Sequence, residues 1–149
     1  MTMLKTIPAT LTPDLLWTIA AMGHGDTLAI VDANYPAHSH HTKVITLAGV
    51  PLVKAIRDLL RFLPVDDFID APVVRMVPDG KPDFVADVHA DIQAILDEAE
   101  GRQVEVRAVE RSAFYPEASK VFAVVATTDD RPFGCFIITK GVIRTSRDA

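Results

Sequence analysis

One histidine stands where the sequence could carry out proton transfer. It is flanked as Gly23-His24-Gly25-Asp26, so no bulky neighbour blocks the approach of a ligand to the imidazole, and the backbone can bend tightly beneath it. An imidazole titrates near neutral pH and can both give and accept a proton, which suits general acid/base catalysis. The same glycines could instead end a helix and turn a corner beside a histidine that is merely exposed. The spacing alone leaves both interpretations open.

Three more histidines crowd one segment, at positions His38, His40 and His41. With His24 and Asp32 they could be ligands for zinc or another divalent ion. Ligands on rigid elements are usually spaced four residues apart or further and are supported by hydrogen bonds, whereas adjacent histidines on a loop are commonly solvated. We therefore expect no metal site, and a metal-dependent hydrolase remains only a minor alternative.

Polar groups beside apolar runs are candidates for holding a polar small molecule. Asp32, Arg111 and Tyr115 are such groups, and they could fix the hydroxyls of a ligand. Each also has a structural alternative: a capped turn, an ion pair and a half-buried ring. The single cysteine, Cys135, lies in an apolar run and is expected to behave as a small hydrophobic residue. The sequence has neither GxGxxG nor GxxxxGK[ST], so nicotinamide redox chemistry and phosphoryl transfer from ATP lose support.

Helices and strands that alternate along the chain must position these residues. The apolar spacing predicts helices over 12–22, 51–63 and 85–99 and a short helical or turned segment over 112–120. Apolar or alternating runs predict strands over 27–33, 43–47, 73–77, 104–109, 121–127 and 133–139, with the last two as a hairpin. Residues 34–42 are predicted to be a loop. The pattern is typical of an α/β layered fold, and we expect a single domain over 1–149 with a central sheet flanked by helices.

Length and composition exclude several classes of protein. With 149 residues, of which 49% are hydrophobic and 23% charged, the chain has the make-up of a globular domain with a buried core. A net charge of -5 argues against a nucleic-acid partner. No apolar run reaches the length of a membrane span, no signal sequence is recognisable, and one cysteine requires no oxidising compartment. We therefore expect a cytoplasmic protein that is not bound to a membrane.

Four separate segments, in the same order, resemble the sugar mutarotase family, which contains D-ribose pyranase and L-fucose mutarotase. They are Met22–Asp26, Val31–Ser39, Glu110–Tyr115 and Ile138–Val142. The opening Leu4-Lys5-Thr6-Ile7 is closer to the fucose branch. The resemblance covers nearly the whole chain and implies the fold of that family.

The resemblance implies an isomerase without a cofactor, which interconverts the α and β anomers of a free monosaccharide, L-fucose or a related sugar. It implies that His24 is the proton donor and that Asp32 and Arg111 bind the sugar. The family's Tyr-Gly-Asn binding triplet falls on Phe133, Gly134 and Cys135, which is a departure. Phenylalanine has no hydroxyl and cysteine is a weak hydrogen-bonding group, so two side-chain hydrogen bonds would be lost or replaced and the preferred sugar could change.

The resemblance also implies a homo-oligomer, a decamer of two pentameric rings, with active sites where subunits meet. The departure at Phe133 and Cys135 leaves a second hypothesis, a non-catalytic sugar-binding or transport-accessory protein of the same fold. His24 and Asp32 favour the enzyme, because a protein that only binds sugar has no need of an imidazole between two glycines.

Overall fold

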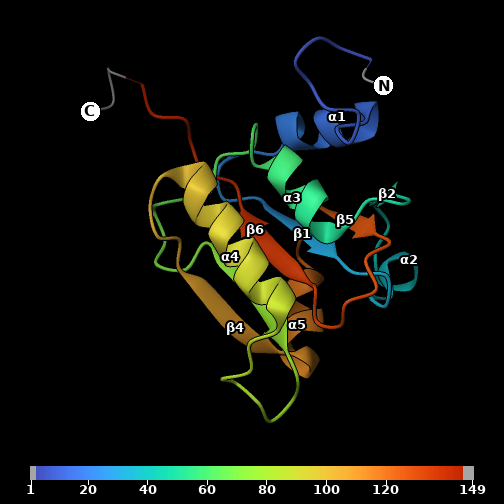
Figure 1. Cartoon of the computed structure of the whole chain (residues 1–149), viewed down its shortest axis with the longest axis vertical. Coiled ribbons are helices and arrows are strands. Elements are labelled where there is room, and N and C mark those ends of the chain that lie inside the picture. The colour runs from blue at the N-terminus through green and yellow to red at the C-terminus, as the bar shows by residue number, and fades with distance from the viewer. Residues whose placement is uncertain (1–2, 146–149) are drawn as a thin grey trace.

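The computed structural model describes residues 3–145 and contains one six-stranded sheet. The strands are β1 (Thr27–Val31), β2 (Val44–Leu47), β3 (Val73–Val77), β4 (Val106–Glu110), β5 (Ala123–Thr127) and β6 (Phe136–Thr139). Their order across the sheet is β2-β5-β1-β6-β3-β4 (Figure 1). The predicted central sheet is therefore confirmed, and β3 has the predicted bounds.

Five of these strands run in one direction. β1 pairs in parallel with β5 and β5 with β2, while β3 pairs in parallel with β4. β6 is antiparallel to both of its neighbours, β1 and β3. We call the edge at which β1 to β5 end the carboxyl edge and the opposite one the amino edge. β6 therefore begins at the carboxyl edge and ends at the amino edge.

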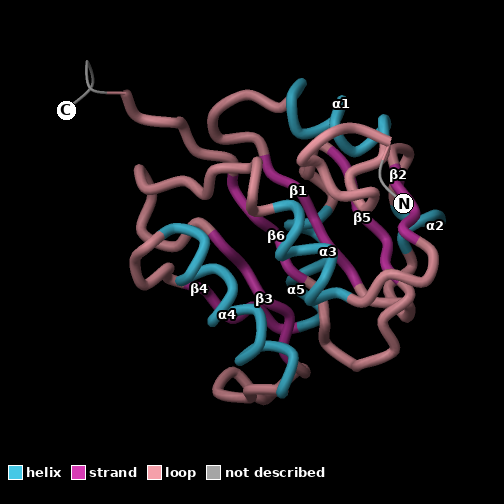
Figure 2. Tube along the Cα trace, turned by 45° about the horizontal axis from the view of Figure 1, so that its top comes forward, coloured by secondary structure: helices cyan, strands magenta, loops and turns pink. Residues whose placement is uncertain are grey.

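Helices cover both faces of the sheet (Figures 1 and 2). They are α1 (Pro13–Ala21), α2 (Ala37–His40), α3 (Leu52–Leu59), α4 (Asp87–Glu100) and α5 (Arg111–Ala118). Buried residues of α1, α3 and α4 form one apolar cluster on one face, and those of α2 and α5 form a second cluster on the other. The predicted arrangement of a sheet flanked by helices is thus confirmed.

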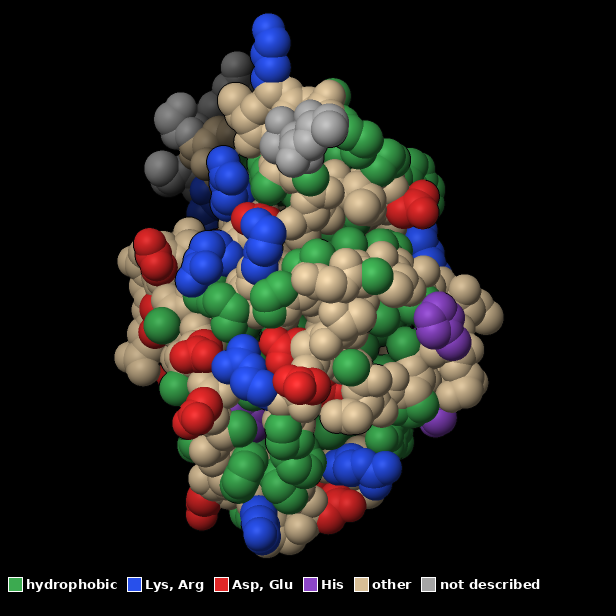
Figure 3. Space-filling model, turned by 45° about the vertical axis from the view of Figure 1, so that its right-hand side comes forward, with side chains coloured by type: hydrophobic (Ala, Val, Ile, Leu, Met, Phe, Trp, Pro, Cys, Tyr) green, Lys and Arg blue, Asp and Glu red, His purple; other side chains and the backbone are tan. Residues whose placement is uncertain are grey.

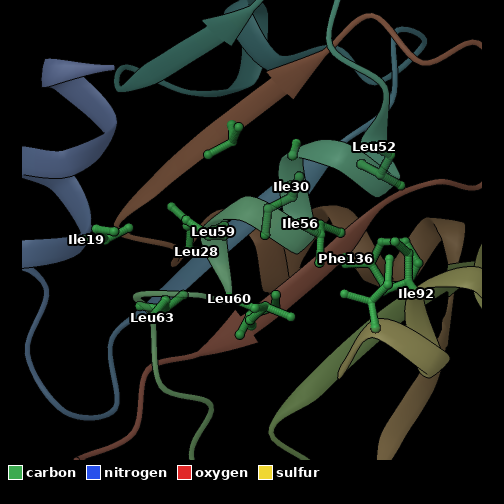
Figure 4. Packing of buried hydrophobic residues seen from close by; sticks show 14 of the residues in the cluster. Ile19, Leu28, Ile30, Leu52, Ile56, Leu59, Leu60, Leu63, Ile92 and Phe136 are labelled. Carbon is green, nitrogen blue, oxygen red and sulfur yellow. The ribbon is translucent and has the colours of Figure 1, made fainter. Parts of the chain in front are cut away.

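The central strand β1 shows how the sequence specifies these two layers. Successive side chains of a strand point to opposite faces, so Leu28 and Ile30 join the cluster of α1, α3 and α4, whereas Ala29 and Val31 join that of α2 and α5. All four residues are completely buried. Figure 4 shows Leu28 and Ile30 beside side chains of α3. Burial of each large aliphatic side chain contributes about 1.5–3 kcal/mol.

Several sequence predictions are wrong. Residues 34–42 are not entirely a loop, because they contain the single helical turn α2. The strand β6 does not form a hairpin with β5, since β1 lies between them. β1 is buried on both faces, so its backbone N–H and C=O groups need a neighbouring strand on each side. The connection over residues 128–135 is long enough to cross the end of β1.

The helix predicted over 51–63 is shorter, because α3 ends at Leu59 and the chain continues to Leu63 in turns. Val85, predicted to lie on the apolar face of a helix, precedes α4 and is exposed. Within residues 3–145 no helix combines the length and the apolar character that a membrane crossing requires.

Candidate functional site

A cavity of about 220 Å³ opens at the carboxyl edge of the sheet. Its lining includes Asp32, which follows β1, Arg111, which follows β4, and Phe133 and Cys135, which precede β6. Ligand sites of open α/β sheets commonly lie at this edge. The structure therefore brings together four of the residues predicted to bind substrate, with Gly134 directly beside them. We call this cavity the carboxyl-edge pocket.

The carboxylate of Asp32 is already held by the backbone. Its Oδ1 accepts hydrogen bonds from the N–H groups of Asn34 (2.9 Å) and Tyr35 (3.1 Å), and its Oδ2 accepts one from Gly134 (3.0 Å). Burial raises the pKa of the Asp32 carboxyl, and these three bonds oppose part of the rise. The Cys135 side chain also forms a hydrogen bond with this carboxylate. A carboxylate has about four acceptor positions, so a ligand bound to Asp32 would share or replace one of these partners.

The segment before β6 fits closely against this carboxylate. A Cβ on Gly134 would lie 3.2 Å from the Leu52 side chain and 3.5 Å from the Cβ of Asp32, so the Leu52 side chain would have to shift slightly to admit it. The Cys135 side chain is 2% exposed. Its burial and the nearby carboxylate of Asp32 raise the pKa of the thiol well above its usual value, so it stays protonated. Cys135 therefore contributes shape and not a nucleophile.

Arg111 and two tyrosines form the opposite wall. Arg111 is exposed, and its guanidinium lies 5.1 Å from the ring centre of Tyr115. Tyr115 stacks on Tyr35 at 5.7 Å between ring centres. This arrangement leaves the Arg111 guanidinium accessible to a polar ligand while the aromatic rings provide flat apolar surface beside it.

One histidine of the 38–41 segment has a partner other than a metal. The Nε2 of His41 lies 2.7 Å from the Tyr35 hydroxyl. Burial lowers the pKa of His41 and raises the pKa of Tyr35 to about 12, so the hydroxyl donates to a neutral imidazole. Among the described residues no group of three or more His, Cys, Asp or Glu is placed to hold a metal ion.

His24 lies at the amino edge, where it precedes β1. Its Nε2 is 2.8 Å from the Oδ1 of Asp66, a residue that is 1% exposed. The Oδ2 of Asp66 accepts hydrogen bonds from the N–H groups of Phe68 and Ile69, both at 3.2 Å. The His24 side chain is 40% exposed, and the Phe68 ring packs against it in an edge-to-face arrangement with 4.6 Å between ring centres. The imidazole is therefore held by a buried carboxylate and remains accessible to a ligand.

The end of β6 supports this pair. Lys140 donates from Nζ to the carbonyl oxygens of Ile19 (2.7 Å) and Met22 (2.6 Å), which closes the end of α1 just before His24. A Cβ on Gly141 would lie 2.7 Å from the Cα of Asp66, a distance that would force the backbone apart. Only glycine fits at position 141 in this arrangement.

The predicted proton donor and the predicted binding residues do not meet within one chain. His24 precedes β1 and Asp32 follows it, so the full length of this strand, roughly 17 Å at ~3.3 Å per residue, lies between them. That distance is several times the width of a pyranose ring. One chain therefore presents two candidate half-sites, one at each edge of the sheet.

Sequence reasoning missed Asp66 and Phe68. They lie in a segment without helical or strand periodicity, and the contact between His24 and Asp66 joins residues 42 positions apart. Only the position of β6 beside both β1 and β3 brings the two segments together, and no sequence signal gave that position.

Comparison with known proteins places these features in context. A family model described as the RbsD / FucU transport protein family matches residues 5–143. The chain is 37% identical over 140 residues to an L-fucose mutarotase of Actinobacillus pleuropneumoniae serotype 5b, which covers 94% of this chain and 97% of that protein.

Two solved structures are also similar. The fucose mutarotase from Streptococcus pneumoniae, solved in complex with L-fucose, has a TM-score of 0.87 and 31% identity, and covers 95% of this chain and 100% of that one. The protein Atu2016, described as a putative sugar binding protein, has a TM-score of 0.90 and 39% identity, and covers 95% and 97%.

Proposed function

This chain belongs to the RbsD / FucU transport protein family, and we propose that it is a mutarotase that interconverts the α and β anomers of L-fucose or a related free monosaccharide. The observation that carries the proposal is the exposed imidazole of His24, fixed by the buried carboxylate of Asp66. The activity named for the similar A. pleuropneumoniae protein, and the L-fucose bound to the similar S. pneumoniae protein, supply the substrate class.

Mutarotation requires only proton transfers around one carbon–oxygen bond. The bond between C1 and the ring oxygen breaks, the ring oxygen takes up a proton, and the anomeric hydroxyl loses one, which gives the open-chain aldehyde. Rotation about the C1–C2 bond and reversal of these steps give the other anomer, so atoms and electrons balance without an oxidant or reductant. General acid/base catalysis of this kind contributes about 10²–10⁴-fold.

In this proposal His24 exchanges the proton and Asp66 positions it. Because the Nε2 of His24 is bonded to Asp66, the Nδ1 atom is the one that gives a proton to the sugar. The contact with Phe68 limits rotation of the ring. Asp32 and Arg111 would bind sugar hydroxyls in the carboxyl-edge pocket, with the backbone of Gly134 and the side chains of Phe133 and Cys135 around them.

The separation of the two half-sites leads us to propose that a second copy of the chain completes each site. His24 of one copy would meet the carboxyl-edge pocket of another. The surface beside His24 suits such an interface, because Phe68 is 59% and Ile143 75% exposed. Apolar side chains also reach the surface near α1 and the N-terminal segment, at the top of Figure 3. We include in this proposal that the chain forms a decamer of two pentameric rings and acts in the cytoplasm.

A second function is favoured by the composition of the pocket. Phe133 offers no hydroxyl and Cys135 only a buried thiol, so these two positions of the pocket offer a sugar little side-chain hydrogen bonding. A non-catalytic sugar-binding or transport-accessory protein of the same fold would have this character. The structural likeness to Atu2016 is in keeping with that alternative.

Saturation-transfer NMR on equilibrated L-fucose, D-ribose, L-rhamnose and D-galactose separates the two functions. We expect the wild-type protein to accelerate exchange between the anomers of at least one of these sugars, and His24→Ala to abolish the acceleration. His38→Ala, the same change at an exposed histidine of α2, is the matched control and should keep full activity. Clear binding with exchange no faster than in buffer would favour the accessory protein. Stoichiometric zinc that survives dialysis, together with activity that a chelator abolishes, would favour the metal-dependent hydrolase.

A further inference from the structure

A second histidine, distant in sequence from the predicted site, has defined hydrogen bonds at both ring nitrogens. His89 lies on α4 and is 3% exposed. Its Nδ1 is 3.0 Å from the backbone nitrogen of Ala86 and 2.9 Å from a terminal guanidinium nitrogen of Arg75, and its Nε2 is 2.9 Å from the carbonyl oxygen of Phe133. The mechanism proposed above does not use this ring.

These partners determine which nitrogen carries the hydrogen. A backbone N–H and a guanidinium can only donate, so the Nδ1 of His89 accepts from them. A carbonyl oxygen can only accept, so Nε2 carries the hydrogen and donates it to Phe133. Burial lowers the pKa of His89, and the positive charge of Arg75 acts in the same direction, which keeps the ring neutral.

Phe133, the residue that receives this bond, has an unusual backbone conformation. Its φ is 61°, in the left-handed region that residues other than glycine rarely adopt. The turn at this residue directs the N–H of Gly134 to Asp32 at 3.0 Å and places the Phe133 side chain in the wall of the carboxyl-edge pocket. The shape of this pocket therefore depends on a conformation that the chain does not favour by itself.

We infer that His89 is a positioning residue for the carboxyl-edge pocket. Its Nε2–H fixes the Phe133 carbonyl, which keeps Phe133 in the left-handed conformation and the Gly134 N–H on the carboxylate of Asp32. Its Nδ1 is held in turn by the start of α4 and by Arg75, which also donates to the carbonyl oxygen of Phe84 at 3.1 Å. This inference rests on the proposed function, since it assigns His89 to the proposed sugar pocket.

A purely structural role for His89 is the competing explanation. The ring also packs edge-on near Phe84 (6.2 Å) and Phe136 (5.9 Å), so its removal would disturb the core. Loss of stability alone is therefore no test. The two explanations differ in whether hydrogen bonding at position 89 controls sugar affinity.

Three variants make the distinction. His89→Leu removes all three hydrogen bonds of the ring, whereas His89→Gln retains an N–H donor and an oxygen acceptor. Ile92→Ala, at a fully buried residue of α4 that does not line the pocket, is the control for loss of packing. We expect His89→Leu to raise the KM for the sugar about 2- to 12-fold, as the loss of one neutral hydrogen bond predicts, with a smaller change in kcat. His89→Gln should recover most of this loss, and Ile92→Ala should lower Tm with an unchanged KM.

Hydrogen exchange at the Gly134 amide gives a measurement that does not require turnover. We expect faster exchange in His89→Leu than in Ile92→Ala at equal stability. An unchanged KM and unchanged Gly134 exchange in His89→Leu, or a His89→Gln variant as impaired as His89→Leu, would overturn the inference.

The wild-type protein provides a test that no folding defect can obscure. ¹⁵N NMR of the His89 ring should show the hydrogen on Nε2, and a hydrogen on Nδ1 would contradict the assignment. If the wild type accelerates no anomer exchange, the proposed function fails, but Gly134 exchange and the His89 tautomer still decide whether His89 holds Phe133.

Discussion

If each site is shared by two copies, two variants that are inactive alone should regain activity when they are assembled together. His24→Ala removes the proposed proton donor at the amino edge. Arg111→Ala removes a proposed sugar ligand at the carboxyl edge, and because Arg111 is exposed its loss should leave the fold intact. A hydrogen bond to a charged group contributes about 1.5–3 kcal/mol, so Arg111→Ala should lower kcat/KM by about 10- to 150-fold. Each variant assembled alone should therefore have little activity.

The separation of the half-sites determines how much activity returns. With roughly 17 Å of β1 between His24 and Asp32, the proposal requires that a working site takes its two halves from different copies. When equal amounts of the two variants co-assemble at random in a closed ring, a site receives an intact His24 half with a probability of about one half and an intact Arg111 half with the same probability. Both halves are therefore intact in about a quarter of the sites. If one copy supplied both halves, no site in this mixture would be intact.

Co-expression with two affinity tags, followed by saturation-transfer NMR at a sugar concentration below KM, measures this fraction. The matched control is wild type co-assembled with the double variant His24→Ala/Arg111→Ala. This control should also have about a quarter of full activity if the halves come from different copies, and about a half if they come from one. The shared site would be refuted if the mixture of single variants were no more active than the average of its two parents and the control retained about half of full activity.

Three further predictions concern single residues. Asp66→Asn replaces one carboxylate oxygen by an NH₂ group, so either the N–H groups of Phe68 and Ile69 or the His24 imidazole loses its acceptor. Denaturant titration should show that the free energy of unfolding falls by about 1–3 kcal/mol, and NMR should show slower anomer exchange. Gly141→Ala should cost about 1–3 kcal/mol by the same titration, because its Cβ would meet the backbone of Asp66 at 2.7 Å; an unchanged Tm would contradict this contact. Burial raises the pKa of Tyr35 from 10.0 to about 12, so the protonated hydroxyl favours the folded state: its contribution to stability is complete below pH 10.0 and is lost as the pH rises toward 12. Tyr35→Phe should remove this part of the alkaline loss in unfolding free energy, and an identical alkaline profile in the variant would count against it.

Local patterns predicted most of the helices and strands but not which of them are neighbours. The apolar run at 73–77 coincides with β3. Thr12 caps α1, since its hydroxyl accepts the Leu15 N–H at 3.3 Å. These features depend on residues a few positions apart. The strand order and the bond between His24 and Asp66 depend on which distant segments pair, and an apolar run can pair with any other apolar run. For that reason the sequence indicated His24 but not Asp66, the carboxylate that holds it.

The pairing of β6 with β1 accounts for both half-sites. In this antiparallel register Ile30 lies opposite Phe136 and Thr27 opposite Thr139. Residues just before β6, including Gly134, therefore meet those just after β1, where Asp32 lies. Residues just after β6 likewise meet those just before β1, which brings Lys140 beside the end of α1 that leads to His24.

A slip of one residue in this register would turn every side chain of β6 to the opposite face. It would also displace the residues before and after β6 that contact the two half-sites. Phe136 and Ile138 belong to one apolar cluster, whereas Ile137 belongs to the other, and all three are buried. The core thus fixes the register, and through it the position of the Gly134 N–H on Asp32 at one edge and of Gly141 against Asp66 at the other. Because assembly would join opposite edges of different copies, an error in this one strand pairing would disturb both of the surfaces that must meet.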